Sequence, residues 1–152
     1  MNLTNRSSAA PVSYLFVPGN RPERFDKALA AGADCVIVDL EDAVPPAEKE
    51  LARAAVMGWL SADKPVAVRI NSGDSPWFTD DLGLCALPGV AAVVLPKAAD
   101  PGDVERVMSS GARSVLALIE SAQGIAQASQ IASMQGVDRL MFGHIDFSVD
   151  LG

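Results

Sequence analysis

Six short apolar segments recur along the chain and divide it into intervals of similar length. Each segment is a continuous run of hydrophobic residues, which is typical of strands that are buried on both faces. The runs are residues 13–18, 35–40, 65–71, 91–97, 114–120 and 139–146. Their first apolar residues lie 22, 30, 26, 23 and 25 positions apart, which is the length of one strand followed by one helix.

Apolar residues at helical spacing occupy most of the intervals between these runs. Residues 47–60 follow two prolines, and their predicted buried face consists of Leu51, Ala54, Ala55 and Trp59. In residues 122–135 the predicted buried face begins with Ile125. The interval from residue 71 to residue 90 has the weakest pattern, which predicts a loop and one short helix.

Regular alternation of strands and helices predicts an α/β protein with a parallel sheet, either doubly wound or closed into a TIM (βα)8-type barrel. The glycine-rich phosphate loops that open sheets often use are missing from the sequence. Polar residues end successive apolar runs, and a barrel would gather them around one mouth, so the barrel is the preferred prediction. These residues are Asp39, Glu41, Asp42, Arg69, Asn71, Lys97, Glu120, His144 and Asp146.

Only six βα units are visible, whereas a closed barrel needs eight. Residues 13–152 are therefore expected to form a partial barrel, and residues 1–12, which are polar, a disordered N-terminal tail. A sheet that lacks two strands would expose its edges. We expect a C-terminally truncated polypeptide, or a barrel that another chain closes.

Composition excludes several classes of protein. The net charge of −7 and the pI of about 4.5 argue against a nucleic-acid partner, which would require a basic surface. No apolar run approaches the roughly 20 residues of a membrane span. Two cysteines give no disulfide framework, and with no signal peptide in view they favour a cytoplasmic location.

The acids at the ends of the fifth and sixth runs, Glu120 and Asp146, are candidate metal ligands. Two carboxylates that leave other positions to water and substrate oxygens suit Mg²⁺. The same acids could instead cap the helices that follow them. Spacing alone leaves both interpretations open.

Two cations end the third and fourth runs. A guanidinium within the apolar segment around Arg69 needs a carboxylate, and Asp39, Glu41 and Asp42 are the available partners. Arg69 is predicted to form such an ion pair, to bind substrate, or both. Lys97 could be a Schiff-base lysine, although an ion pair or a solvated charge is the simpler interpretation.

Six motifs in order resemble the citrate lyase β-subunit family of CoA-ester lyases, within the HpcH/HpaI aldolase and citrate lyase superfamily. They are the sequences SYLFVPGNRP (13–22), VDLEDAV (38–44), VRIN (68–71), LPK (95–97), IES (119–121) and FGxxDF (142–147). The resemblance covers residues 13–152, and the order of the motifs makes it far more specific than any one motif.

This resemblance implies a TIM barrel in which Glu120 and Asp146 bind Mg²⁺ and a 3-hydroxyacyl-CoA is cleaved to acetyl-CoA and a keto acid. It gives Arg69 a role in binding substrate oxygens, with Glu41 and Asp42 as further catalytic residues. Arg21 and Pro22 would line the CoA phosphates, and Asn71 and Lys97 complete the predicted substrate-binding set. The implied partners are the acyl-CoA, an acyl-carrier protein or other lyase subunits, and a homo-oligomer, trimeric or hexameric.

Two alternatives remain at this point. Related class II pyruvate aldolases share the barrel and the two metal acids, but they show Glu-His where this chain has Glu41-Asp42. The chain could also be a non-catalytic fragment or a partner subunit that serves only in assembly.

Overall fold

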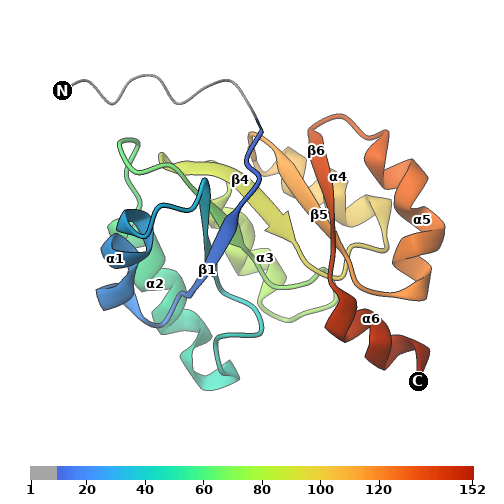
Figure 1. The fold of residues 1–152 in the computed structure, drawn as a ribbon, viewed down its shortest axis with the longest axis horizontal. Coiled ribbons are helices and arrows are strands. Elements are labelled where there is room, and N and C mark those ends of the chain that lie inside the picture. Colours follow the sequence, from blue (N-terminus) through green and yellow to red (C-terminus); the bar gives the residue numbers. More distant parts are fainter. Residues whose placement is uncertain (1–9) are drawn as a thin grey trace.

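The computed structural model describes residues 10–152, which form one six-stranded sheet (Figure 1). All neighbouring strands are parallel, and their order in the sheet follows their order in the chain. The strands are β1 (Tyr14–Pro18), β2 (Cys35–Asp39), β3 (Val66–Arg69), β4 (Val90–Leu95), β5 (Val115–Ile119) and β6 (Val137–Phe142). All six predicted apolar runs therefore contain strands.

A helix follows each strand, as the sequence pattern predicted for the first five strands; α6 was not predicted, and it begins within the sixth apolar run. The helices are α1 (Phe25–Ala30), α2 (Lys49–Trp59), α3 (Phe78–Asp81), α4 (Pro101–Ser109), α5 (Ala122–Ala132) and α6 (His144–Leu151). Helix α3 is only one turn long, in keeping with the weak pattern of that interval. No helix within residues 10–152 is both long enough and apolar enough to cross a membrane.

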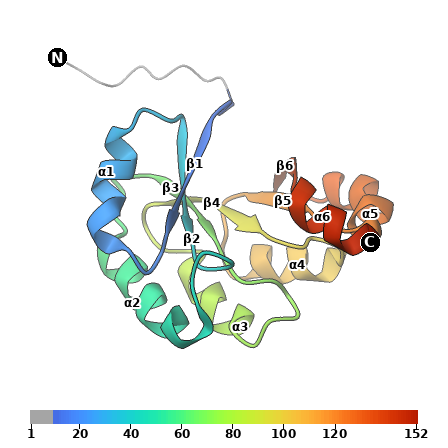
Figure 2. The same cartoon turned by 60° about the horizontal axis from the view of Figure 1, so that its bottom comes forward.

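Two apolar clusters lie on opposite faces of the sheet. The larger one joins strand residues such as Val38 and Val68 to residues of helices α1–α5, among them Phe25, Val56 and Val104. The buried members of the smaller one are strand residues alone, namely Ile37, Ala67, Val94, Leu116 and Leu118. Helices α1–α5 therefore cover the same face, as Figure 2 also shows. A doubly wound sheet would have helices on both faces.

The sheet is strongly curved. Although β1 and β6 are its two edges in the described part of the chain, Arg139 of β6 donates hydrogen bonds to the Tyr14 hydroxyl (3.0 Å) and to the Pro11 carbonyl oxygen (2.6 Å). Sequential order, helices on one face and this curvature are consistent with part of a (βα)8 barrel. Six strands do not by themselves show a closed one.

The beginning of the described chain is attached to the sheet. The backbone N–H of Val12 donates to Asp34 Oδ2 (3.1 Å), and Arg139 holds the Pro11 carbonyl. Residues 11 and 12, predicted to belong to a disordered tail, thus have defined partners. Residues 1–9 of that predicted tail lie outside the described residues.

The predicted buried faces of two helices were wrong by one position. Leu51 of α2 is 71% exposed, and the buried residues are Lys49, Ala52 and Val56. In α5, Ile125 is 50% exposed, whereas Gly124 is buried. The α2 prediction failed because a lysine occupies the inner face, which a purely apolar pattern does not anticipate.

Candidate active site

The guanidinium of Arg69 lies at the carboxyl end of β3 and is held by the last residue of β2. Its Nε donates to Asp39 Oδ1 (2.7 Å) and its Nη2 to Asp39 Oδ2 (2.5 Å), a bidentate pair with a carboxylate that is 1% exposed. Parallel register sets these residues side by side. The ring of Phe16 lies 5.0 Å from the guanidinium carbon. The predicted ion pair of Arg69 is present.

Glu41 follows this pair and lies between two cations. Its Oε2 is 3.1 Å from Arg69 Nη1, and its Oε1 accepts a hydrogen bond from Lys97 Nζ at 2.5 Å. Burial raises the pKa of Glu41, against the opposing effect of Lys97 and Arg69. Asp42, 56% exposed, lies 3.9 Å from Arg69 and 3.7 Å from Lys97. The predicted catalytic residues therefore form one continuous charged cluster.

Glu120, directly after β5, is 7% exposed and anchored by the β4–α4 loop. Its Oε2 accepts a hydrogen bond from the backbone N–H of Lys97 (2.9 Å). Lys97 has a φ of 49°, the left-handed conformation that non-glycine residues rarely adopt. Burial raises the pKa of the Glu120 carboxyl, and the charges of Glu41 and Asp146 raise it further.

Asp146, predicted at the end of a strand, lies in the first turn of α6. Its Oδ2 is 3.8 Å from Lys97 Nζ, so Lys97 links Asp146 to Glu41 and, through its backbone, to Glu120. Residues from the ends of five of the predicted runs, the second to the sixth, thus meet at one place.

The donor set of Glu120 and Asp146 suits a hard divalent cation. Both offer carboxylate oxygens, and mutual repulsion among Glu41, Glu120 and Asp146 favours a positive charge nearby. Gly143 leaves the required space, because a Cβ there would collide with Glu120 Oε1. In residues 10–152 no three His, Cys, Asp or Glu side chains form a group able to hold a metal. A cation here would take its other ligands from water and substrate, as Mg²⁺ does.

A second, buried network supports the acidic turn and was not predicted from the sequence. Lys49 Nζ donates to the carbonyl oxygens of Leu40 (2.7 Å) and Glu41 (2.6 Å) and to Asn71 Oδ1 (2.7 Å). Asn71 Nδ2 donates to Asp81 (2.6 Å). The spacing of Lys49 from Ala52 and Val56 was the available signal, since it sets all three on one helical face.

The hydrogen bonds and ion pairs of the other predicted site residues are made with partners outside the charged cluster. Arg21 is ion-paired with Glu23 (2.7 Å), and Pro22 begins the short 3-10 helix before α1. Asn71 is buried, and both ends of its amide are engaged by Lys49 and Asp81. Asn71 therefore connects Lys49 to Asp81, it also lines the cavity beside the charged cluster, and its role in substrate binding stays a prediction.

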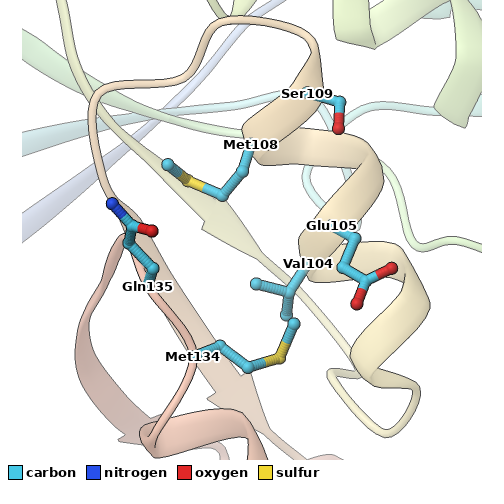
Figure 3. Close-up of a pocket in the computed structure, with 6 residues that line it drawn as sticks. All are labelled: Val104, Glu105, Met108, Ser109, Met134 and Gln135. Atoms are coloured by element: carbon cyan, nitrogen blue, oxygen red, sulfur yellow. The ribbon is translucent and has the colours of Figure 1, made fainter.

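Two cavities differ in their relation to this cluster. One of about 420 Å³ adjoins it and is lined by Glu41, Asp42, Lys97, Lys49 and Trp77, among others. A larger one of about 580 Å³ lies between α4 and the segment before β6 (Figure 3). Its lining residues are Val104, Glu105, Met108, Ser109, Met134 and Gln135. Of these two cavities, the smaller one contacts the candidate site.

The fold and site define an α/β protein with carboxylates and cations clustered at the carboxyl end of a parallel sheet, the usual place for chemistry in such folds. The family model for HpcH/HpaI aldolase/citrate lyase matches residues 12–152, so the chain belongs to this family. This membership was predicted from the motifs and is confirmed.

Curated relatives include CoA-ester enzymes. A citrate lyase subunit beta-like protein of Mycobacterium tuberculosis is 40% identical over 95% of this chain, and an L-malyl-CoA/beta-methylmalyl-CoA lyase of Cereibacter sphaeroides is 36% identical over 91%. The matches cover 51% and 49% of those proteins. The chain thus spans about half the length of the curated relatives it matches.

Solved structures show the same fold. The citrate lyase beta subunit from M. tuberculosis complexed with oxaloacetate and magnesium has a TM-score of 0.83 at 40% identity, over 95% of this chain and 63% of that chain. An M. tuberculosis protein in complex with magnesium, acetoacetate and coenzyme A has a TM-score of 0.82 at 40% identity, over 95% of this chain and 52% of that chain.

Proposed function

We propose that this site serves Mg²⁺-dependent carbon–carbon cleavage of a 3-hydroxyacyl-CoA of the citryl-CoA, malyl-CoA or citramalyl-CoA type, giving acetyl-CoA and a keto acid. The observation that most supports this proposal is the meeting of two carboxylate ligands, Glu120 and Asp146, with the cations Arg69 and Lys97 at one end of the sheet. The magnesium, oxaloacetate and coenzyme A bound to structurally similar proteins agree with it.

The reaction removes the proton of the 3-hydroxyl group and breaks the bond between carbons 2 and 3. The electron pair of that bond passes to the thioester as an enolate, and a proton then completes acetyl-CoA, so no oxidant or reductant is needed. Mg²⁺ held by Glu120 and Asp146 would polarise the hydroxyl and carboxylate oxygens of the substrate.

The residues of the chain supply positioning and charge. Arg69, fixed by Asp39, presents its guanidinium to a substrate carboxylate or carbonyl oxygen, where developing negative charge is stabilised. Glu41, whose pKa is raised by burial, lies between Arg69 and Lys97 and helps to hold both cations in place. Asp42, exposed beside both cations, completes the acidic side of the site.

Several finer assignments are part of the same proposal. The six-stranded sheet would belong to a (βα)8 barrel, and its sequential strand order and the helices on one face support this. Arg21 and Pro22 would contact the CoA phosphates. An acyl-carrier protein in place of CoA, other lyase subunits and a trimeric or hexameric homo-oligomer remain predictions.

The test is Mg²⁺-dependent release of acetyl-CoA from citryl-, malyl- and citramalyl-CoA, with Glu120→Ala as the control. We expect release from at least one ester and its loss in the variant. Equal rates in parent and variant would refute the metal assignment. Condensation of pyruvate with an aldehyde, without activity on any acyl-CoA, would favour the aldolase alternative.

A further inference from the structure

Lys49 is the first residue of α2, and it is 6% exposed. All three N–H donors of its ammonium are used, at 2.6 to 2.7 Å, by the Leu40 and Glu41 carbonyl oxygens and by Asn71 Oδ1. The ring of Trp77 lies 5.2 Å from the same nitrogen. Three neutral oxygens thus enclose one buried positive charge.

The oxygens that Lys49 binds come from two different strand ends. Leu40 and Glu41 follow β2, and Asn71 follows β3. The Leu40–Glu41 peptide is otherwise held by Glu41 N–H, which donates to Asp39 Oδ1 (2.8 Å), and the Glu41 carbonyl oxygen also accepts a hydrogen bond from Val44 N–H (3.0 Å). Leu40 N–H also donates to the Arg69 carbonyl oxygen (2.8 Å), so Lys49 adds a further link from this turn to β3 and joins the turn to α2.

Burying an ammonium is costly, and here burial lowers the pKa of Lys49 despite nearby carboxylates. A residue used only for packing would be apolar, as Ala52 and Val56 are on the same helical face. An ammonium has three N–H donors, so a single side chain can hold two backbone carbonyls and the Asn71 amide oxygen at once. The turn that these carbonyls belong to carries the Glu41 carboxylate into the space between Arg69 and Lys97.

We propose that Lys49 is a positioning residue: its ammonium fixes the Leu40 and Glu41 carbonyls and thereby holds the Glu41 carboxylate between Arg69 and Lys97. The role of this contact in catalysis rests on the proposed function, whereas its effect on the turn does not. Residues of this kind around a metal site typically contribute 10- to 100-fold to metal affinity or activity.

The test compares Lys49→Met and Lys49→Ala with the parent chain. We expect amide hydrogen exchange at residues 41 and 44 to become at least about tenfold faster, while exchange in β5 is unchanged. Mg²⁺ affinity or kcat should fall by about 10- to 100-fold. In Lys49→Ala, added propylammonium, which replaces the missing atoms, should restore part of each loss, and 1-propanol should not.

Lys64→Met is the matched control. Like the ammonium of Lys49, that of Lys64 lies beside a tryptophan ring, 5.4 Å from that of Trp59. It pairs with Asp26 at 2.7 Å, but it lies on the surface. All readouts should stay within about twofold of the parent. If Lys49→Met matched the parent in exchange at residues 41 and 44, the proposal would be overturned.

Two further outcomes have their own interpretation: a Lys49 variant that does not fold, and a parent chain without activity. If Lys49→Met does not fold, Lys49→Ala is refolded with propylammonium and the amine is then diluted. Local loss of protection at residues 41 and 44 with an unchanged circular dichroism spectrum supports positioning, and simultaneous global unfolding overturns it. A parent chain that neither binds Mg²⁺ nor cleaves an acyl-CoA counts against the proposed function, and the exchange rates still decide the role of Lys49.

Discussion

The two ends of the sheet differ in the side chains and cavities that lie there. At the carboxyl end, Glu41, Lys97 and Glu120 meet in a charged cluster beside a cavity of about 420 Å³. Near the amino end of β6 lies the larger cavity of about 580 Å³, where Met108 and Met134 provide a mainly apolar lining. Size alone would select the cavity that lies away from the charged cluster. Converging charges and raised pKa values favour the cavity beside the cluster as the candidate site. Holding charged groups in this arrangement lowers the stability of the fold, which is typical of functional sites.

Arg69→Met should have the largest effect on the charged end of the sheet. It leaves Asp39 and Glu41 as buried carboxylates without their guanidinium, so we expect a loss of about 3–5 kcal/mol in the free energy of unfolding. Urea denaturation followed by circular dichroism measures it. Adding Asp39→Asn should recover part of the loss, and a double variant as unstable as the single one would argue against the pair as the cause.

Glu120→Gln should raise the stability of the metal-free protein and abolish its response to Mg²⁺. The raised pKa means that the folded state prefers the neutral carboxyl, so above that pKa the ionised group lowers stability. Without metal the variant should therefore have a higher Tm than the parent at pH 7, and the gap should close as the pH falls toward and below the ordinary value of 4.5.

The same pair of proteins reports on the metal. Added Mg²⁺ should raise the Tm of the parent and leave that of Glu120→Gln unchanged. The assignment of Glu120 as a Mg²⁺ ligand would be contradicted if Mg²⁺ left the Tm of the parent unchanged, or if it raised the Tm of the variant equally.

Gly143→Ala should displace the Glu120 carboxylate, because the new methyl group would collide with Oε1. We expect about 1–3 kcal/mol of destabilisation and roughly tenfold weaker Mg²⁺ binding, measured by calorimetry. Gly58→Ala in α2 is the control, since nothing lies within 4 Å of a Cβ there. It should be neutral or stabilise the chain by up to about 1 kcal/mol.

Met134→Leu changes the other end of the molecule. A swap that nearly conserves volume at a partly buried position should alter the free energy of unfolding by less than about 1.5 kcal/mol. Mg²⁺ affinity and acetyl-CoA release should equal those of the parent. A marked effect on either would mean that the larger cavity communicates with the charged cluster.

Much of the architecture could be predicted because continuous apolar runs specify buried strands. The polar residues that end these runs then lie together at the carboxyl end of the parallel sheet. The pairing of Arg69 with a carboxylate of the β2 end was predicted as one of three choices, and Asp39 proved to be the bidentate partner. The buried faces of α2 and α5 were missed by one position, which corresponds to about 100° around a helix.

Lys49 and Asp81 could not be assigned from the sequence. Asp81, 1% exposed, binds Asn71 and also accepts a hydrogen bond from Arg53 Nε at 2.8 Å. These partners are 10 and 28 residues away in the chain. Their meeting depends on the path of residues 71–81, for which the pattern predicts little beyond a loop.

By itself the sequence determined which segments are strands, that they are parallel, and which end of the sheet bears charge, because these properties follow from hydrophobic runs and their spacing. The tertiary structure alone decided which acid meets which cation. Glu41 pairs with Lys97 across 56 residues, and Arg139 reaches Tyr14 across 125, because strand register and sheet curvature bring them together. Such contacts form only when the whole sheet has assembled.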